Sequence, residues 1–154
     1  MSLQEIDSRL RTACAQGDLV LVKRLLSQGA DVNSTDGDGW SALHYAAAAG
    51  CVEVVKTLIE AGTNLNTQSK KTGWTPLYFA AASESSLDAA IALLNAGADV
   101  TLTDAAGRTP FDMSNGRAVR EYYESWLAAK AISEAFASGS VDDKAITSKR
   151  GLSL

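Results

Sequence analysis

The sequence predicts an all-α solenoid of helix-turn-helix units with β-turn fingers, closed by a long C-terminal helix. Three observations predict it. Gly39, Gly73 and Gly107 follow one another at intervals of 34 residues, which is the phase of a short repeat. Apolar residues after these glycines recur at helical spacing. Alanine supplies 26 of the 154 residues, so neighbouring backbones are expected to lie close together.

The first unit, about residues 6–35, is predicted to be two helices around a turn at Gly17. Leu25 and Leu26 mark the apolar side of its second helix. The unit lacks the Thr-Pro start that later units carry, as expected of a terminal unit that caps a stack.

The second and third units, about residues 36–68 and 69–103, carry clearer helix signals. Thr75 is expected to cap a helix that begins at Pro76, where a missing N–H costs nothing. Ser41 gives a weaker start of the same kind. Gly62 and Gly97 are expected to end the second helices, because glycine accepts a positive φ. The apolar sides of those helices are predicted from Val52, Val55, Leu58 and Ile59, and from Leu87, Ile91 and Leu94.

The fourth unit, about residues 104–127, departs from the pattern. Thr109 is expected to cap a helix that starts at Pro110, with Asp112 completing a capping box. A long helix then follows over residues 117–137, closed by Ser138 and Gly139. Its apolar side is expected to pack on the preceding repeat, or in part to face a partner. That side comprises Val119, Tyr122, Tyr123, Trp126 and Phe136.

The chain is expected to form one domain over residues 1–137, followed by a tail over residues 138–154. Ser140 with Asp143 could begin a short helix in this tail, and the residues after it are polar.

Several motifs recurring in phase resemble the ankyrin repeat. Thr75-Pro76-Leu77 and Thr109-Pro110-Phe111 match the family's TPLH start, and Gly29-Ala30-Asp31-Val32-Asn33 matches its GADVN end. The resemblance covers about residues 6–127 as four repeats, with both end repeats atypical. In this family the histidine that matches His44 ties adjacent repeats by hydrogen bonds, and Tyr78 and Asp112 occupy the matching positions of the next two units.

Composition argues against several classes of function. The net charge of −4 offers no basic field for nucleic acid or for an acidic membrane surface. No apolar run is long enough for a membrane span, and the first residues are too charged for a secretory signal. Cys14 and Cys51 are expected to be reduced residues in or near the core. The chain is expected to work in the cytoplasm or the nucleus, and to be a monomer.

Catalytic signatures are not found. The single histidine lies in the repeat motif, which argues against a Ser-His-Asp or Cys-His centre. There is no phosphate-binding loop, and the residues lack the spacing of a zinc or calcium site. We therefore expect no enzymatic activity, no metal and no cofactor.

The resemblance implies that the chain binds another protein in a concave groove formed by the fingers and the first helices. The aromatic residues expected there are of types enriched in binding hot spots. Trp40 and Trp74 have an alternative role, packing one finger against the next. The predicted partner-binding residues are Asp38, Trp40, Tyr45, Lys71, Trp74, Phe79, Arg108 and Met113.

The predicted function is a non-catalytic adaptor or scaffold. The alternative is a stoichiometric inhibitor of a partner enzyme such as a protein kinase, which rests on length and repeat number alone.

Overall fold

The computed structural model describes residues 1–139. Residues 1–119 form one compact unit, and the described residues from Arg120 onward belong to a second. All the repeats and fingers lie in the first unit.

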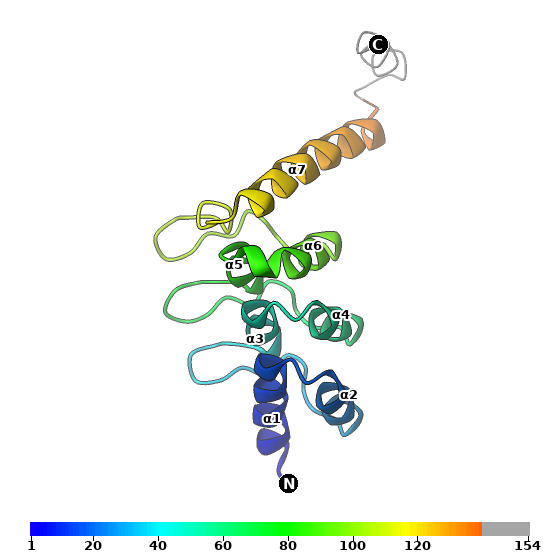
Figure 1. The fold of residues 1–154 in the computed structure, drawn as a ribbon, viewed down its shortest axis with the longest axis vertical. Helices are drawn as coiled ribbons and strands as arrows, with labels where there is room; N and C mark the ends of the chain where they lie inside the picture. Colours follow the sequence, from blue (N-terminus) through cyan, green and yellow to red (C-terminus); the bar gives the residue numbers. More distant parts are fainter. Residues whose placement is uncertain (140–154) are drawn as a thin grey trace. The chain divides into compact units, whose positions relative to one another are not determined.

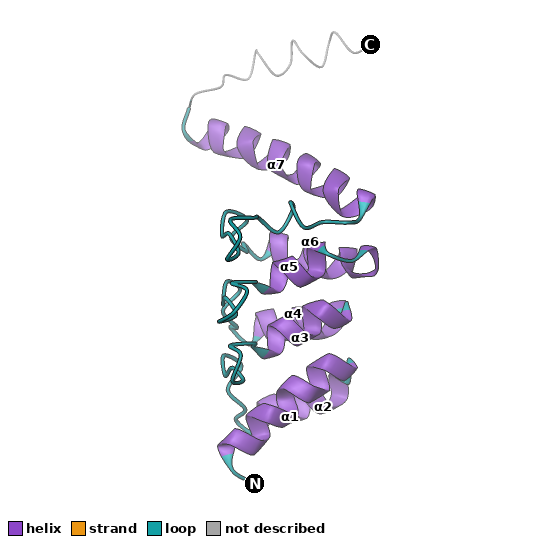
Figure 2. Ribbon diagram, turned by 90° about the vertical axis from the view of Figure 1, so that its left-hand side faces the viewer, coloured by secondary structure: helices purple, strands orange, loops and turns teal. Residues whose placement is uncertain are grey.

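The first unit is a stack of helix pairs (Figure 1). Each pair has an inner helix that contacts the inner helices of its neighbours, and an outer helix behind it. The loops between pairs all project to one side, the left in Figure 1, and in Figure 2, where that side faces the viewer, they lie one above another. This confirms the predicted all-α repeat architecture. The inner helices are α1 (Leu3–Gln16), α3 (Ala42–Ala49) and α5 (Pro76–Ala81), and the outer ones are α2 (Leu19–Ser27), α4 (Val52–Glu60) and α6 (Leu87–Asn95), with a 3₁₀ turn, η1 (Glu84–Ser86), before α6.

The helix ends form where the sequence places capping residues. Ser2 and Glu5 make a capping box at the start of α1. Asp18 accepts a hydrogen bond from the backbone of Leu21 at the start of α2. Pro76 is the first residue of α5, as expected. The expected cap is not made, because the buried Thr75 hydroxyl has no hydrogen-bond partner among residues 1–139.

Small residues on the inner helices allow close stacking. Ala46 and Ala47 of α3 and Ala80 and Ala81 of α5 are fully buried. Leu43 is buried as well, at a gain of about 2 kcal/mol for a side chain of its size. The alanine-rich composition therefore has its place in the contact between inner helices.

The outer helices are rotated from the predicted register. Val54, which the prediction did not include, is buried, whereas Val52 and Ile59 are only half-buried. In α6 the residues Leu87 and Ile91 are likewise half-buried. The reason is that apolar residues lie on both sides of the predicted stripe, so spacing alone does not define its centre. The buried residues are Val54, Val55 and Leu58 in α4, and Ala89, Ala90, Leu93 and Leu94 in α6.

Asparagine side chains join successive repeats behind the fingers. Asn33 Oδ1 accepts a hydrogen bond from the backbone N–H of Asn64 at 2.7 Å. One repeat later, Asn66 Oδ1 accepts from the N–H of Asp99 at 2.8 Å. At the next matching position Thr101 bonds to its own neighbour Asp99 instead. This hydrogen bond from an asparagine side chain to the next repeat, called the asparagine joint below, is therefore made at two successive positions and is absent at the third.

Each finger is a tight turn closed by a backbone hydrogen bond. The first finger spans residues 36–40, the second 69–74 and the third 104–108, with the first residue donating to the last at 2.9 to 3.0 Å. The second finger is one residue longer than the other two. Ser69 replaces the aspartate that begins the other two fingers.

Adjacent fingers touch through their backbones. The N–H of Lys70 donates to the carbonyl of Asp38, and the N–H of Ala105 donates to that of Thr72, both at 2.9 Å. This approach requires glycine at position 39. Gly39 has φ +82°, and a Cβ there would lie 3.1 Å from the nitrogen of Lys70.

The third residue of α3, and likewise of α5, ties its repeat to the following finger. His44 Nδ1 accepts from the N–H of Ser41, so the proton is on Nε2, which donates to the carbonyl of Trp74 at 2.9 Å. Tyr78 occupies the same position in α5, and its hydroxyl donates to the carbonyls of Leu102 and Arg108. The structural role expected of His44 is confirmed, and Tyr78 takes it over.

The helix expected to begin at Pro110 does not form. The expected capping box exists, because Asp112 accepts from the N–H of Thr109 and donates its own N–H to the Thr109 hydroxyl. Residues 110–113 nevertheless form only a hydrogen-bonded turn. The three residues after Met113, which include Asn115 and Gly116, leave no room for a helix before the next one starts.

The long helix α7 spans Arg117–Ala137, as predicted, and ends before Gly139. Only Val119 is buried. Beyond it, Tyr123 and Trp126 stack with their ring centroids 6.2 Å apart, and Lys130 Nζ lies 5.0 Å from the Trp126 ring. Packing of this helix on the preceding repeat stays a prediction, and the short helix expected from Ser140 lies outside the described residues.

Replacing Gly39 by Ala is expected to destabilise the chain more than replacing Gly107. Both glycines have a positive φ, +82° and +75°. A Cβ at Gly107 would meet nothing within 4 Å, because no finger follows the third one, so only Gly39→Ala forces adjacent fingers apart. We expect a difference of about 1 kcal/mol or more in the free energy of unfolding, measured by urea denaturation. Equal losses would contradict the close contact between fingers.

Acidification is expected to weaken the stack through His44. Burial lowers the pKa of His44 below its usual value of 6.5. The unfolded chain then binds more protons than the native one, so stability is full above pH 6.5 and falls as the pH drops below it. The slope cannot exceed about 1.4 kcal/mol per pH unit for one proton.

Urea denaturation at pH 7.5, 6.0 and 5.0 checks this, with His44→Gln as the control. His44 is the only histidine, so the variant should show a flatter dependence over this range. An unchanged slope in His44→Gln would contradict the assignment.

Candidate partner-binding surface

Four side chains predicted from the sequence come together on the finger side of the stack. Trp40 is at the end of the first finger and Trp74 at the end of the second, while Tyr45 and Phe79 project from α3 and α5. Ring centroids lie 5.5 Å apart for Tyr45 and Trp40, 4.8 Å for Trp40 and Phe79, and 5.3 Å for Phe79 and Trp74. These four rings are called the aromatic surface below.

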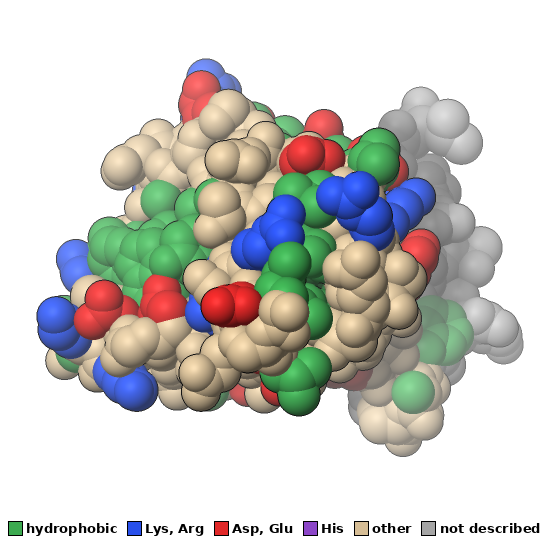
Figure 3. Space-filling model, turned by 90° about the horizontal axis from the view of Figure 1, so that it is seen from below, with side chains coloured by type: hydrophobic (Ala, Val, Ile, Leu, Met, Phe, Trp, Pro, Cys, Tyr) green, Lys and Arg blue, Asp and Glu red, His purple; other side chains and the backbone are tan. Residues whose placement is uncertain are grey.

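The aromatic surface is partly open. All four side chains are half-buried, and the planes of neighbouring rings are inclined at 56° to 76°. Figure 3 shows a continuous hydrophobic area on the finger side of the molecule, with acidic and basic side chains at its edge. Ala48 and Ala49 follow Tyr45, and Ala82 follows Phe79, at the spacing of three or four residues that puts side chains on one side of a helix, and all three are exposed. The inner helices thus present aromatic and small apolar groups together.

Asp36 organises the first finger beneath Trp40. Its Oδ1 accepts from the N–H groups of Asp38 and Trp40, and its Oδ2 accepts from the Tyr45 hydroxyl at 2.6 Å. Donation to Asp36, together with burial, raises the pKa of Tyr45 to about 12. Although partial burial opposes it, the bonds from Tyr45 and the backbone hold the pKa of Asp36 below its usual value. Sequence reasoning missed this aspartate, whose signal is its position three residues before the finger glycine.

Asp104 plays the corresponding part in the third finger. Its Oδ1 accepts from the N–H groups of Ala106 and Arg108, and the Arg108 side chain pairs with Oδ2 at 2.9 Å. The indole N–H of Trp74 also donates to Oδ2, at 3.3 Å. Bonds from the backbone of Arg108 and from its guanidinium hold the pKa of Asp104 below its usual value, against the opposing effect of desolvation. Trp74 therefore packs one finger on the next while one side of its ring meets Phe79.

Charged residues of the prediction lie at the tips of the fingers. Asp38 and Lys71 are exposed and pair with each other at 3.4 Å, an exposed contact of small energetic value. Lys70 Nζ donates to the carbonyl of Gly37. Arg108 is exposed at the third finger, and Met113 is half-buried in the turn that follows it. Within residues 1–139, neither Arg108 nor Met113 makes a ring contact or a side-chain hydrogen bond with the four aromatic rings.

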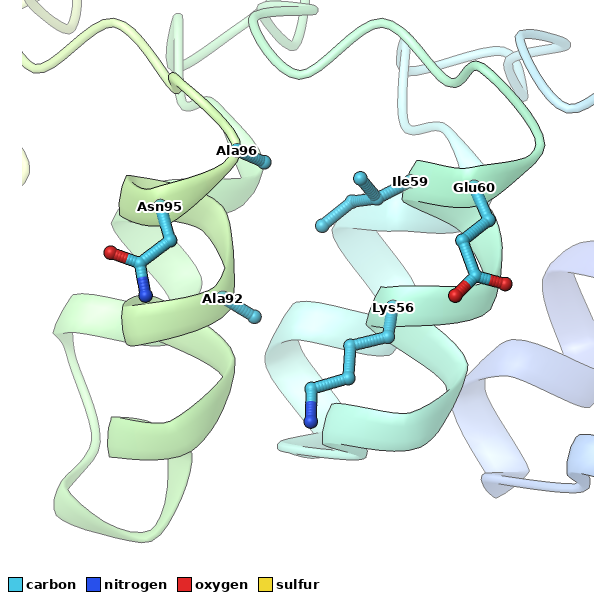
Figure 4. Close-up of a pocket in the computed structure, with 6 residues that line it drawn as sticks. All are labelled: Lys56, Ile59, Glu60, Ala92, Asn95 and Ala96. Atoms are coloured by element: carbon cyan, nitrogen blue, oxygen red, sulfur yellow. The ribbon is translucent and has the colours of Figure 1, made fainter.

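A hollow lies between the outer helices α4 and α6, on the side of the stack away from the fingers. Figure 4 shows Lys56 and Ile59 of α4 pointing toward α6, with Ala92 and Ala96 facing them. Charged and polar residues, Lys56, Glu60 and Asn95, lie among those that line it, and no aromatic residue does. It therefore lacks the residue types that the aromatic surface offers a partner.

Other kinds of site are not formed by the described residues. Within residues 1–139, no three His, Cys, Asp or Glu side chains are placed to hold a metal ion. Cys14 is buried and Cys51 half-buried, both with free thiols. Helices long and apolar enough to cross a membrane do not occur in this part of the chain.

Comparison with known proteins identifies the repeats. A family model described as "Ankyrin repeats (3 copies)" matches residues 10–104. The NF-kappa-B p105 subunit of Gallus gallus is 34% identical over 114 residues, covering 72% of this chain and 12% of that protein. Tyrosine-protein kinase Shark of Drosophila melanogaster is 33% identical over 111 residues, again covering 72% of this chain and 12% of the relative.

A further relative is named for its ankyrin repeats. Ankyrin repeat and SAM domain-containing protein 6 of Rattus norvegicus is 36% identical over 102 residues, covering 66% of this chain and 11% of that protein. The chain thus spans about one eighth of the length of these relatives. Both the matched model and the helix pairs of the structure lead to one conclusion: the chain belongs to the ankyrin-repeat family.

Proposed function

We propose that the chain is a non-catalytic module that holds another protein against its aromatic surface, as an adaptor or scaffold. Ankyrin repeats are protein-protein interaction modules, and the observation that supports this particular site is the contiguous array Tyr45–Trp40–Phe79–Trp74. Half-exposed Trp, Tyr and Phe are the side chains that contribute most at protein interfaces.

Rigidity supports the same proposal. The rings are fixed by bonds within the stack, because Tyr45 donates to Asp36 and Trp74 to Asp104. A partner therefore does not have to order these side chains, and this reduces the entropic cost of binding. The finger tips carry a negative charge on Asp38 and a positive charge on Lys71. These charges favour a partner segment that itself carries charges of both signs.

The remaining features of this role are proposals as well. We expect a monomer that binds no nucleic acid and works in the cytoplasm or nucleus. Inhibition of a partner enzyme such as a kinase remains the alternative outcome of partner binding, and no contact in the structure distinguishes it from an adaptor role.

Blocking the groove without disturbing its packing tests the proposal. Ala49 and Ala82 are exposed beside the aromatic rings, so Ala49→Glu with Ala82→Glu places charge where a partner would lie. We expect partner proteins captured from the source cells to be lost at least tenfold, as measured by quantitative mass spectrometry. The melting temperature should stay within about 3 °C of the parent, because surface changes alter stability little.

Ala61→Glu is the matched control, since Ala61 is exposed at the end of outer helix α4. It should retain the captured proteins. Their loss from the Ala61→Glu variant, or retention by the groove variant, would contradict the proposed site. Tyr45→Ala with Phe79→Ala is a less specific test, because both rings also pack within the stack.

A further inference from the structure

The indole N–H groups of the two finger tryptophans differ. Trp74 Nε1 donates to Asp104. No residue among 1–139 accepts a hydrogen bond from Trp40 Nε1, and this nitrogen is not among the buried polar side-chain atoms that lack a partner. The N–H of Trp40 is therefore a donor without a protein acceptor that is not fully buried, on the ring that lies between Tyr45 and Phe79.

The difference follows from the fingers that come next. Trp74 finds its acceptor in Asp104, the first residue of the third finger. The first residue of the second finger is Ser69, whose hydroxyl is engaged with Thr72 and with the N–H of Trp74. A serine is also too short to reach across as the aspartate does. Trp40 is thus left without the acceptor that its counterpart has.

An open donor beside aromatic rings limits the conformation of a bound segment. The carbonyls inside an α-helix are already bonded within the helix, so a partner helix has none to offer along its length. A β-strand would require a sheet edge to pair with, and residues 1–139 contain only the isolated bridge between Thr35 and Ser41. A polyproline II segment meets neither obstacle, because it has no internal hydrogen bonds and its carbonyls point outward.

The rings suit such a segment. Their centroids follow one another at about 5 Å, and their inclined planes leave faces and edges against which proline rings can pack. The exposed alanines beside them leave space for an extended chain. We propose that the aromatic surface binds a proline-rich segment in the polyproline II conformation, with one of its carbonyls accepting a hydrogen bond from Trp40 Nε1. This inference rests on the proposed function and gives it a partner chemistry.

Nitrogen-15 NMR of the indole groups tests it with capped decaproline as the probe. The chain has three tryptophans, so it gives three indole N–H signals, and Trp40→Phe and Trp74→Phe assign them. On titration with decaproline to millimolar concentration, the Trp40 signal should move downfield along a saturating curve. The signals of Trp74 and Trp126 should move less.

Trp40→Phe should weaken decaproline binding about three- to tenfold, the value of one hydrogen bond. Trp126→Phe is the matched control, because it makes the same ring-for-ring change at a tryptophan of α7 that is outside the aromatic surface. It should bind decaproline within about twofold of the parent.

Three results would overturn the inference: no saturable shift of the Trp40 signal, equal decaproline binding by Trp40→Phe, or a larger shift caused by a capped helical Leu-Lys peptide. If Ala49→Glu with Ala82→Glu loses the captured proteins while decaproline does not bind, this inference fails and the proposed function stands. If the captured proteins are retained while decaproline binds at Trp40, the proposed function fails.

Discussion

One hydrogen bond, made in two successive repeats, fixes how the fingers stack. A side chain at the third position of α3 and of α5 reaches the last carbonyl of the next finger, from His44 to Trp74 and from Tyr78 to Arg108. Because this bond holds the second finger against the first, Gly39 must be free of a Cβ. The same bond places Trp74 within reach of Phe79. The spacing of fingers and the formation of the aromatic surface are therefore a single constraint.

Residues of the aromatic surface serve the stack and the groove together. Trp74 and Arg108 meet on Asp104, while Tyr45 is tied to Asp36 at the base of the first finger. Buried and half-buried aromatic contacts of this kind resist rearrangement, so the surface has its shape before a partner arrives. Trp40 differs, since its ring is packed but its N–H is not used. The indole N–H of Trp40 is thus the one polar group of the four rings without a hydrogen-bond partner among residues 1–139.

Repeat phase was enough to predict the helix pairs, the start of α5 at Pro76 and the grouping of the aromatic residues. It did not predict that the Thr75 hydroxyl leaves the helix start uncapped. It did not predict the register of the outer helices, because Val52 and Val54 lie on either side of an apolar stripe whose centre depends on the neighbouring repeat. A local capping box at Thr109 also did not secure a helix, since a helix needs residues to continue it. The difference between the two indole N–H groups depends on Ser69, which is far from Trp40 in the sequence. It could be recognised only once the fold showed that the first residue of each finger lies near the tryptophan of the finger before it.

The asparagine joints give the stack a direction of growth. Asn33 and Asn66 each present an acceptor to the following repeat, and Thr101 at the third position turns to Asp99 instead. A repeat unit copied and inserted between the existing joints would find the same acceptor before it and supply the same acceptor after it. Beyond Thr101 that chemistry is missing, so lengthening the protein by duplication is easy in the middle of the stack and requires a new residue at its end.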